Sequence, residues 1–534
     1  MIKNKKQSFM QAIFTLMFSQ VIIKILGLAY KLYLTNKEGF GDSGNAISSS
    51  GFQIYAILLT ISSIGVPNAV AKLISERISI GDEKGANKIF KVAFATFSIV
   101  GFLSAVFLFC SANFLANYVL QIPEAELTLM VLAPSIFFEA LISVYKGYFN
   151  GYQNMKPMAA SQAIEQLSKT TLTIFLVEII CYIFGNSRQI TFLMSAGANF
   201  ATTIATFVGF CYLTKIYLKM ERNIHNTRSK TLRVKNILIS IIVIAMPMTI
   251  TAFLGSLNKN IDAITVVREL KNFLSEEQAQ IQYGILSGKV ETLVMLPLSF
   301  NIALSVTLIP AISAAMASGN MQEVKRRISF SLLITMLIAL PCSIGMLLYA
   351  KPILELLFPN ASSGAILLQI SCISIIFITI EQTIMGALQG IGKVYVPIIS
   401  LLCGVIVKLI MNIILVKINP TNFFFGGING AALGTLISHI TSTIISILIL
   451  RKYIKFEFNI NKFIVKPIVA VIFMSAISYT IFIKMNSIIL SKITTIIAII
   501  VAGATYVISV FALRIFNKNE LGMVQILKKT SKNE

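Results

Sequence analysis

Two lysines inside apolar segments are the residues of this chain whose type and spacing could do chemistry. Lys169 and Lys408 each lie near the middle of a long apolar stretch. Each follows a glycine by 18 residues, because the phrase GYFNG ends at Gly151 and the phrase GALQG ends at Gly390. A charge at the centre of a bilayer costs about 2.5–3.5 kcal/mol even on lenient insertion scales. Two such lysines in matching places predict a cationic interior that has a function.

Further charged residues inside apolar segments extend this cationic interior. An ammonium group is a good point-charge partner for phosphate, whereas a cavity lined by lysines would repel a hydrophobic cation. We therefore expect an anion-binding cavity. The candidate binding lysines are Lys24, Lys31, Lys72, Lys169, Lys259, Lys289 and Lys408. The candidate ion-coupling or charge-pairing carboxylates are Glu139, Glu165, Asp262 and Glu381.

Spacing along a helix predicts which of these charges are neutralised locally. Glu165 and Lys169 are four residues apart, in the favourable order for an ion pair. Lys259 and Asp262 are three residues apart and can also pair. Lys408 has no carboxylate within its own apolar segment, so it is the better candidate for an exposed charge. The alternative of snorkelling to a nearby membrane interface applies to Lys31, Lys72 and Lys289.

Metal-binding and redox residues are sparse. The six cysteines form no C-x-x-C motif and are expected to be small apolar core residues. The chain has two histidines, too few for a metal site of their own, and we interpret His439 as an interhelical hydrogen-bonding residue. We expect no metal and no cofactor, apart from a monovalent cation or proton that could couple to transport.

Composition identifies the fold class as an all-α integral membrane protein. The chain is 56% hydrophobic, and its mean hydropathy is +0.81. Many apolar runs exceed the roughly 20 residues that span about 30 Å of hydrocarbon. Fourteen transmembrane helices are predicted near 9–34, 47–74, 88–112, 127–149, 158–184, 190–217, 237–266, 284–317, 328–350, 364–389, 395–418, 426–450, 464–484 and 490–513.

The net charge of +23 is explained by membrane orientation rather than by nucleic-acid binding. Basic residues concentrate in the segments that face one side when the spans alternate, which is the positive-inside pattern. This predicts a multi-pass protein of the bacterial cell membrane with both termini in the cytoplasm. The basic clusters include Lys84, Lys88 and Lys91; Arg222, Arg228, Lys230, Arg233 and Lys235; Lys325, Arg326 and Arg327; and Arg451, Lys452 and Lys455.

An internal repeat organises the spans. Lys31 follows Gly27 by four residues in the first span, and Lys259 follows Gly255 by four in the seventh. Corresponding spans share their orientation, so the duplication is parallel and predicts two six-helix lobes plus two C-terminal helices. The expected segments are an N-terminal lobe at 1–218, a linker at 219–236, a C-terminal lobe at 237–455, a final helix pair at 456–514 and a tail at 515–534.

Missing motifs exclude several function classes. No G-x-x-x-x-G-K-[ST] motif is present, so a built-in ATPase is not expected. The polar breaks are too short for a soluble catalytic domain. The first outer loop offers only the separated Glu38 and Asp42, which disfavours a membrane glycosyltransferase. We therefore expect a transporter without catalytic residues rather than an enzyme.

Three segments carry a resemblance to a known family. The run from Gly51 to Lys72, GFQIYAILLTISSIGVPNAVAK, resembles the second span of bacterial polysaccharide exporters. The run from Tyr283 to Ser313 resembles the eighth span of the lipid II flippases, and the phrase GYFNGYQ at 147–153 adds to this. The whole chain resembles the stage V sporulation protein B family of the multidrug/oligosaccharidyl-lipid/polysaccharide exporter superfamily.

This resemblance implies a fold and a set of binding residues. It implies two lobes that open alternately to each side, a central cationic cavity for a lipid-linked sugar diphosphate, and a groove beside the last two spans for the polyprenyl tail. It also implies that basic residues on the first, second and eighth spans contact the diphosphate. Those positions are typically arginine in the family, and the counterparts here are Lys24, Lys31, Lys72 and Lys289.

The resulting hypothesis is a monomeric flippase that moves an undecaprenyl-diphosphate-linked cell-wall precursor, lipid II first among them, from the inner to the outer leaflet. Its expected partners are this lipid-linked glycan diphosphate and membrane lipids, with no nucleic acid. An ion gradient or the membrane potential would drive it. The alternatives are a flippase for teichoic or capsular precursors, a cation-coupled multidrug exporter and, in a different class, a membrane glycosyltransferase or ligase.

Overall fold

The computed structural model describes residues 9–152, 154–185, 187, 189–221, 233–454, 459–487 and 491–516, and every regular element in these ranges is helical. Thirteen helices or continuous helical runs in them are long and apolar enough to cross a membrane. A helix satisfies its backbone hydrogen bonds internally, which a hydrocarbon environment requires. The all-helical membrane fold expected from the sequence is confirmed.

The expected count of fourteen spans is not confirmed. Helix α1 (Phe9–Asn36) is a further helix of 28 residues, and its length of about 42 Å exceeds the roughly 30 Å of bilayer hydrocarbon. Most of the predicted linker and tail, at 222–232 and 517–534, lies outside the described residues. The cytoplasmic location predicted for the basic residues there, including Arg222, Arg228 and Lys230, therefore stays a prediction.

The described helices belong to two compact units. The division into two six-helix lobes expected from the sequence stays a prediction. Unit 1 comprises Met1–Thr292 and Val405–Gly434, and unit 2 comprises Leu293–Gly404 and Thr435–Glu534. Besides α1, unit 1 holds α2 (Gly41–Leu59), η1 (Thr60–Ile64), α3 (Val66–Ser79), α4 (Glu83–Phe114), η2 (Leu115–Leu120), α5 (Ala125–Gly151), α6 (Lys156–Phe184), α7 (Ile190–Glu221), α8 (Val234–Leu270), α9 (Glu276–Gly284), η3 (Ile285–Val290) and η4 (Asn412–Val416).

Unit 2 holds the C-terminal helices, and three helices cross from one unit to the other along the chain. The helices wholly in unit 2 are α11 (Met321–Leu348), α12 (Ala350–Leu357), α13 (Ala365–Gly390), η5 (Asn461–Val465), α16 (Lys466–Asn486) and α17 (Ser491–Ala512). The helices that begin in one unit and end in the other are α10 (Glu291–Ala317), α14 (Val396–Met411) and α15 (Gly427–Tyr453).

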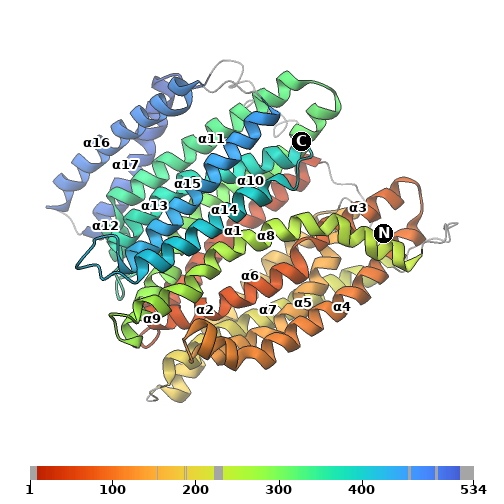
Figure 1. The fold of residues 1–534 in the computed structure, drawn as a ribbon, viewed down its shortest axis with the longest axis horizontal. Helices are drawn as coiled ribbons and strands as arrows, with labels where there is room; N and C mark the ends of the chain where they lie inside the picture. The colour runs from red at the N-terminus through yellow and green to blue at the C-terminus, as the bar shows by residue number, and fades with distance from the viewer. Residues whose placement is uncertain are drawn as a thin grey trace. The chain divides into compact units, whose positions relative to one another are not determined.

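Aromatic packing holds the core of unit 1 together where α4, α5 and α7 lie side by side (Figure 1). The ring of Phe90 on α4 stacks on Tyr217 of α7, with centroids 4.4 Å apart. It also meets Tyr148 of α5 edge-on at 5.0 Å. All three side chains are buried. Offset and edge-on ring pairs of this kind stabilise a core beyond the area that they bury.

The repeated glycine phrase packs a helix closely in each unit. A Cβ atom on Gly147 would lie 2.7 Å from Cβ of Val70, so α5 approaches α3 as closely as it does only because this position is glycine. In unit 2, a Cβ atom on Gly390 would lie 2.8 Å from Cβ of Ile312 on α10. Small residues let membrane helices approach closely. A glycine of each phrase therefore lies against a neighbouring helix of its own unit.

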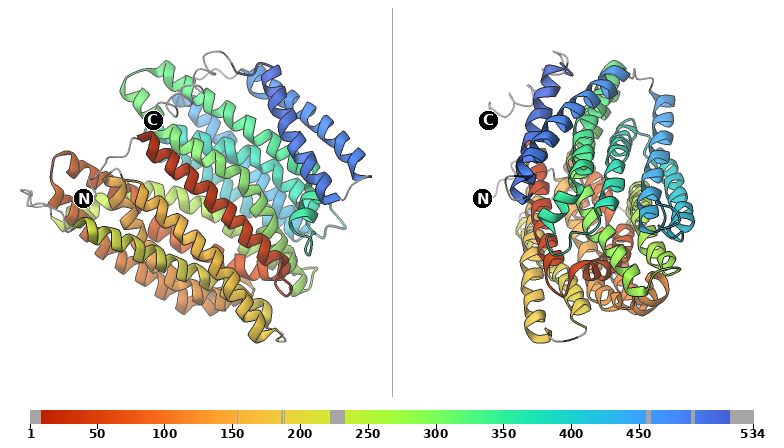
Figure 2. Two further views of the ribbon diagram at one scale, coloured as in Figure 1. Left: turned by 180° about the vertical axis from the view of Figure 1, so that it is seen from behind. Right: turned by 90° about the vertical axis from the view of Figure 1, so that its left-hand side faces the viewer.

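In unit 2, the two C-terminal helices form a side-by-side pair, drawn in blue in Figure 2. The ammonium group of Lys466, at the start of α16, donates to the backbone carbonyls of Leu513 and Arg514 at 3.0 and 3.4 Å. A cation is favourable at the carbonyl end of a helix. The hydroxyl of Tyr506 on α17 donates to the carbonyl of Leu337 on α11 at 3.0 Å. These bonds hold α16 against the end of α17, and α17 against α11.

Two π-helical segments of unit 1 carry polar side chains into the interior. Segment η3 contains Lys289, and segment η4 begins at Asn412. Both side chains are buried. A π turn holds one residue more than an α turn and occurs often at functional sites. The two segments therefore place one buried ammonium group and one buried amide in the interior of unit 1.

Candidate functional site

Lys408 is buried in an ion pair rather than exposed. Its side chain is 2% exposed, and its Nζ atom lies 2.6 Å from Oδ2 of Asp262 on α8. The amide of Asn412 donates to the other carboxylate oxygen at 2.8 Å and to the hydroxyl of Thr265 at 2.9 Å. The prediction that Lys408 is an exposed charge was wrong, because its partner comes from a helix far away in the sequence. The structure pairs Asp262 with this lysine.

Lys289 is neutralised in the same way. Its side chain is fully buried, and its Nζ atom lies 2.9 Å from Oδ1 of Asp42, at the start of α2. A snorkelling lysine would keep its ammonium group in water, so that interpretation is wrong for Lys289. Asp42 was noticed in the sequence only as an isolated loop carboxylate. Its role as a partner depends on the packing of α2 against η3, which no local pattern reveals.

Lys169 lies between two aromatic rings. Its Nζ atom is 5.2 Å from the ring centre of Tyr30 on α1 and 5.1 Å from that of Phe52 on α2. The negative face of an aromatic ring attracts a cation at this distance. Within the described residues Lys169 forms no ion pair. The expected pair with Glu165 is absent, because the Glu165 carboxylate instead accepts a hydrogen bond of 2.5 Å from Ser161.

Two lysines of α1 extend the positive charge around Lys169. Lys31 is half-buried and is repelled electrostatically by Lys169. Lys24, two turns earlier, is exposed and is repelled by Lys259 of α8. Neither Lys24 nor Lys31 forms an ion pair within the described ranges. The structure therefore brings four of the predicted lysines into electrostatic contact in two like-charged pairs.

Glu291 is the carboxylate that faces this group of lysines. It interacts electrostatically with Lys31, Lys259 and Lys408, and it begins α10 beside the buried Lys289. The sequence showed Glu291 next to Lys289 but gave no reason to place it near α1. Asp42, the partner of Lys289, also attracts Lys31. We define the three lysines of this group that form no ion pair in the described part of the chain, Lys24, Lys31 and Lys169, as the open lysines.

The remaining predicted residues have surroundings of their own. Lys72 is exposed on α3, as a snorkelling lysine would be. Glu139 pairs with Lys146 two turns along α5, at 2.9 Å. In unit 2, the buried Glu381 of α13 accepts from Ser442 and lies 2.9 Å from Nδ1 of His439, both on α15. The interhelical hydrogen bond expected of His439 is confirmed.

The structure gives no metal centre a place among the residues that it describes. No group of three or more histidine, cysteine, aspartate or glutamate side chains is arranged there to hold a metal ion. All six cysteines are free thiols. The chemistry available at the open lysines is therefore electrostatic binding of an anion, with aromatic rings beside one of the three.

Comparison with known proteins decides the family. Residues 9–316, more than half of the chain, match the family described as polysaccharide biosynthesis protein. The chain belongs to this family. A second family, MatE, matches residues 283–414. The matched regions overlap at 283–316, which contains the segment from Tyr283 to Ser313 that resembles the eighth span of the lipid II flippases.

Two proteins of Bacillus subtilis are similar to this chain over most of its length. The chain is 26% identical over 484 residues to lipid II flippase MurJ of Bacillus subtilis (strain 168), covering 87% of this chain and 86% of that one. It is 25% identical over 537 residues to stage V sporulation protein B of the same organism, covering 98% of each. The resemblance seen in the sequence is thus confirmed.

A solved structure shares the fold of this chain. A lipid II flippase MurJ structure in an inward closed conformation superposes with a TM-score of 0.70 at 16% identity, covering 93% of this chain and 98% of that one. At this identity the match shows the fold alone. The apolar helices and this shared fold identify a multi-pass membrane protein.

Proposed function

We propose that this protein moves a lipid-linked glycan diphosphate across the membrane and catalyses no covalent reaction. The observation that carries the proposal is the set of open lysines, Lys24, Lys31 and Lys169, on α1 and α6. Lys24 and Lys169 lie near the middle of helices long enough to span a bilayer. An uncompensated charge there is costly, and a phosphate group would compensate it.

The proposed substrate is an undecaprenyl-diphosphate-linked cell-wall precursor, with lipid II as the first candidate. A diphosphate carries more than one negative charge, which suits the three open lysines, none of which forms an ion pair within the described ranges. The names of the relatives, lipid II flippase and stage V sporulation protein B, support this class. The proposed direction is from the inner to the outer leaflet, by a monomer with both termini in the cytoplasm.

Not every predicted lysine is retained in the binding role. Lys408 and Lys289 are neutralised by Asp262 and Asp42, so we assign them to structure rather than to diphosphate binding. Lys259 stays a candidate because it repels Lys24 and faces Glu291. The proposed binding group thus lies on α1, α6 and α8 of unit 1. It differs from the set that the family resemblance implied, because it includes α6 and α8 and leaves out Lys72 and Lys289.

The coupling ion is proposed to be a monovalent cation or a proton. Asp262 and Glu139 are occupied by lysines, which leaves Glu165 and Glu381 as the candidates among the predicted carboxylates. Glu381 shares its hydrogen bonds with an imidazole and a hydroxyl, groups that can exchange protons. Transport assayed with an imposed proton gradient, in the wild type and in Glu381→Gln, tests this choice.

The substrate test is rescue of bacteria depleted of their lipid II flippase. Expression of the wild-type chain is expected to restore growth, and Lys169→Gln is expected to fail at equal membrane abundance. Lys72→Gln, which removes an exposed lysine of α3 that is not one of the open lysines, is the matched control and should still rescue. Absence of rescue by abundant wild-type protein would exclude lipid II.

The family name also supports a teichoic or capsular precursor as substrate. The same experiment in cells depleted of a teichoic-acid or capsular-precursor flippase separates these glycans, because only the matching depletion should be rescued. A multidrug exporter of cations is disfavoured by the sign of the open lysines. It would confer drug resistance on expression, which we do not expect.

A further inference from the structure

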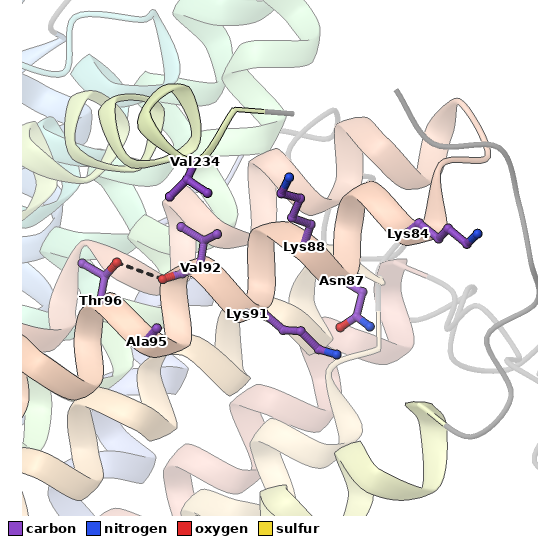
Figure 3. Close-up of a pocket in the computed structure, with 8 residues that line it drawn as sticks. All are labelled: Lys84, Asn87, Lys88, Lys91, Val92, Ala95, Thr96 and Val234. Carbon is purple, nitrogen blue, oxygen red and sulfur yellow. Dashed lines mark hydrogen bonds between the residues drawn. The ribbon is translucent and has the colours of Figure 1, made fainter. Parts of the chain in front are cut away.

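A cleft in unit 1 lies apart from the open lysines. It has a volume of about 470 Å³, within the range of about 300–1,000 Å³ that small-molecule sites occupy. Figure 3 shows the residues that line it along the first turns of α4 and at the start of α8. They are Lys84, Asn87, Lys88, Lys91, Val92, Ala95, Thr96 and Val234.

Three lysines give the cleft a positive rim. Lys84, Lys88 and Lys91 follow one another at helical spacing and are all exposed. Lys84 and Lys88 form no ion pair within the described ranges. Figure 3 shows the three side chains reaching in different directions from α4, so they spread positive charge along the rim rather than meet at one point. The hydroxyl of Tyr217 donates to the side chain of Asn87 at 2.9 Å and fixes this part of the rim.

The inner wall of the cleft is apolar and continues along the helices into the membrane. Val92, Ala95 and Val234 line the cleft itself. Beyond them, the lysine face of α4 carries exposed apolar side chains at Ile99, Phe102, Val106 and Phe109. The first turns of α8 expose Ile239 and Ile242. Exposed apolar stripes on spanning helices face lipid chains. One helix face therefore changes from cationic to apolar along its length.

We propose that this cleft binds an anionic phospholipid, with its phosphate among Lys84, Lys88 and Lys91 and its acyl chains along the apolar faces of α4 and α8. Basic pockets between spanning helices recognise anionic lipid headgroups. A soluble phosphate would use the lysines but would leave the adjoining apolar stripe unexplained. The site is separate from the proposed diphosphate site, because none of the lysines assigned to the cargo lines the cleft.

The test measures lipid binding by the purified full-length protein. Dioleoyl phosphatidylglycerol and dioleoyl phosphatidylcholine share the same chains and differ in headgroup charge. Native mass spectrometry is expected to show tighter binding of phosphatidylglycerol. Each lysine should account for about a fivefold change in affinity, which is the equivalent of about 1 kcal/mol per basic residue near an anionic lipid. Raising the ionic strength should weaken the preference.

A matched pair of triple variants locates the site. Lys84→Gln, Lys88→Gln and Lys91→Gln together should abolish the preference for phosphatidylglycerol. Lys325→Gln, Arg451→Gln and Lys452→Gln together remove the same charge from unit 2, where none of the three lines the cleft, and should leave the preference in place. The single variant Lys88→Gln, on an exposed side chain, gives a partial loss that can be measured even if the triple variant is poorly folded.

Two results would overturn the proposal. One is an equal loss of preference in both triple variants, or in neither, because the cleft would then contribute nothing specific. The other is that free glycerol phosphate competes as strongly as phosphatidylglycerol, because the apolar wall would then have no role and the cleft would be a soluble-phosphate site. A Val92→Ser, Val234→Ser double variant that weakens lipid binding but not glycerol phosphate binding would support the proposal.

Discussion

At the scale of residues, the lysines of unit 1 divide into those that hold the fold together and those that have no counter-charge. Lys408 and Lys289 each lie against one aspartate from another helix, within 2.9 Å. A buried pair adds little net stability, but removal of one partner leaves a buried charge and is costly. Sequence position alone does not separate the classes, since Lys408 and Lys169 follow the same glycine phrase.

The Asp262–Lys408 pair gives a stability prediction. Asp262→Leu should destabilise the protein by about 3–5 kcal/mol, because Lys408 would stay buried without its carboxylate. Adding Lys408→Met should recover part of that loss, since an apolar pair of similar volume avoids the buried charge. The chain contains no tryptophan, so thermal unfolding followed by circular dichroism is the suitable measurement. A double variant no more stable than Asp262→Leu alone would contradict this account of the pair.

Lys169 gives a transport prediction. Lys169→Gln should lower transport of a fluorescent lipid-linked diphosphate in proteoliposomes about tenfold or more, while the amount of folded protein is unchanged. Lys169→Arg should retain most of the activity, because an arginine keeps the charge and also stacks on aromatic rings. Equal transport by the wild type and the glutamine variant would show that this lysine is structural.

At the scale of elements, close packing in each unit depends on a few small residues. Gly147 brings α5 against α3, and Gly390 brings α13 against α10. The sequence repeat marked both phrases, but only the structure shows that each glycine faces a neighbouring helix. The π-helical segments η3 and η4 were not foreseen, because an extra residue in one helical turn leaves the apolar pattern nearly unchanged.

The glycine interface gives a packing prediction. Gly147→Ala would place a Cβ atom 2.7 Å from Val70, and overpacking of this kind costs about 1–3 kcal/mol. Gly503→Ala, on α17 with no atom within 4 Å of the new Cβ, is the control. It should be neutral or stabilising by up to about 1 kcal/mol, since alanine favours helix more than glycine does. In one detergent, the melting temperature of Gly147→Ala should therefore fall, and that of Gly503→Ala should stay the same or rise.

The sequence predicted the helices well and the charge partners poorly. Apolar runs of about 20 residues are a local property, so the spans follow from length and composition. Asp262 and Lys408 are 146 positions apart, and their pairing depends on how α8 packs against η4 and α14. The local spacing rule favoured Glu165 as the partner of Lys169, but Ser161 bonds that carboxylate. Lys408 and Asn412, four residues apart, were an available signal of one shared partner.

At the scale of the whole molecule, the chain is a set of membrane helices with only short polar connections among its described residues. Its family is polysaccharide biosynthesis protein, and its fold is shared with a solved MurJ structure. Thirteen candidate spans are found in the described ranges, and α1 is a further long helix. Whether α1 crosses the membrane decides whether the two ends of the chain lie on the same side.

Topology gives the prediction at this scale. Fourteen spans place both termini in the cytoplasm, as the distribution of basic residues indicates. Green fluorescent protein fused to either end should then fluoresce, and alkaline phosphatase fused to either end should be inactive. A fluorescent C-terminal fusion together with an active N-terminal phosphatase fusion would mean thirteen spans, with α1 outside the membrane.

The aromatic rings beside Lys169 have a consequence for the part of a transport cycle in which nothing is carried. A carrier that releases its anion must reset with its binding charge uncovered, and a bare ammonium group in a low-dielectric interior would slow that step. The rings of Tyr30 and Phe52 stabilise the Lys169 ammonium group when no anion is bound. A bound anion can replace these contacts, because a cation–ring contact is worth only about 0.5–2 kcal/mol. We therefore expect the rings to set the speed of the empty return more than the strength of substrate binding.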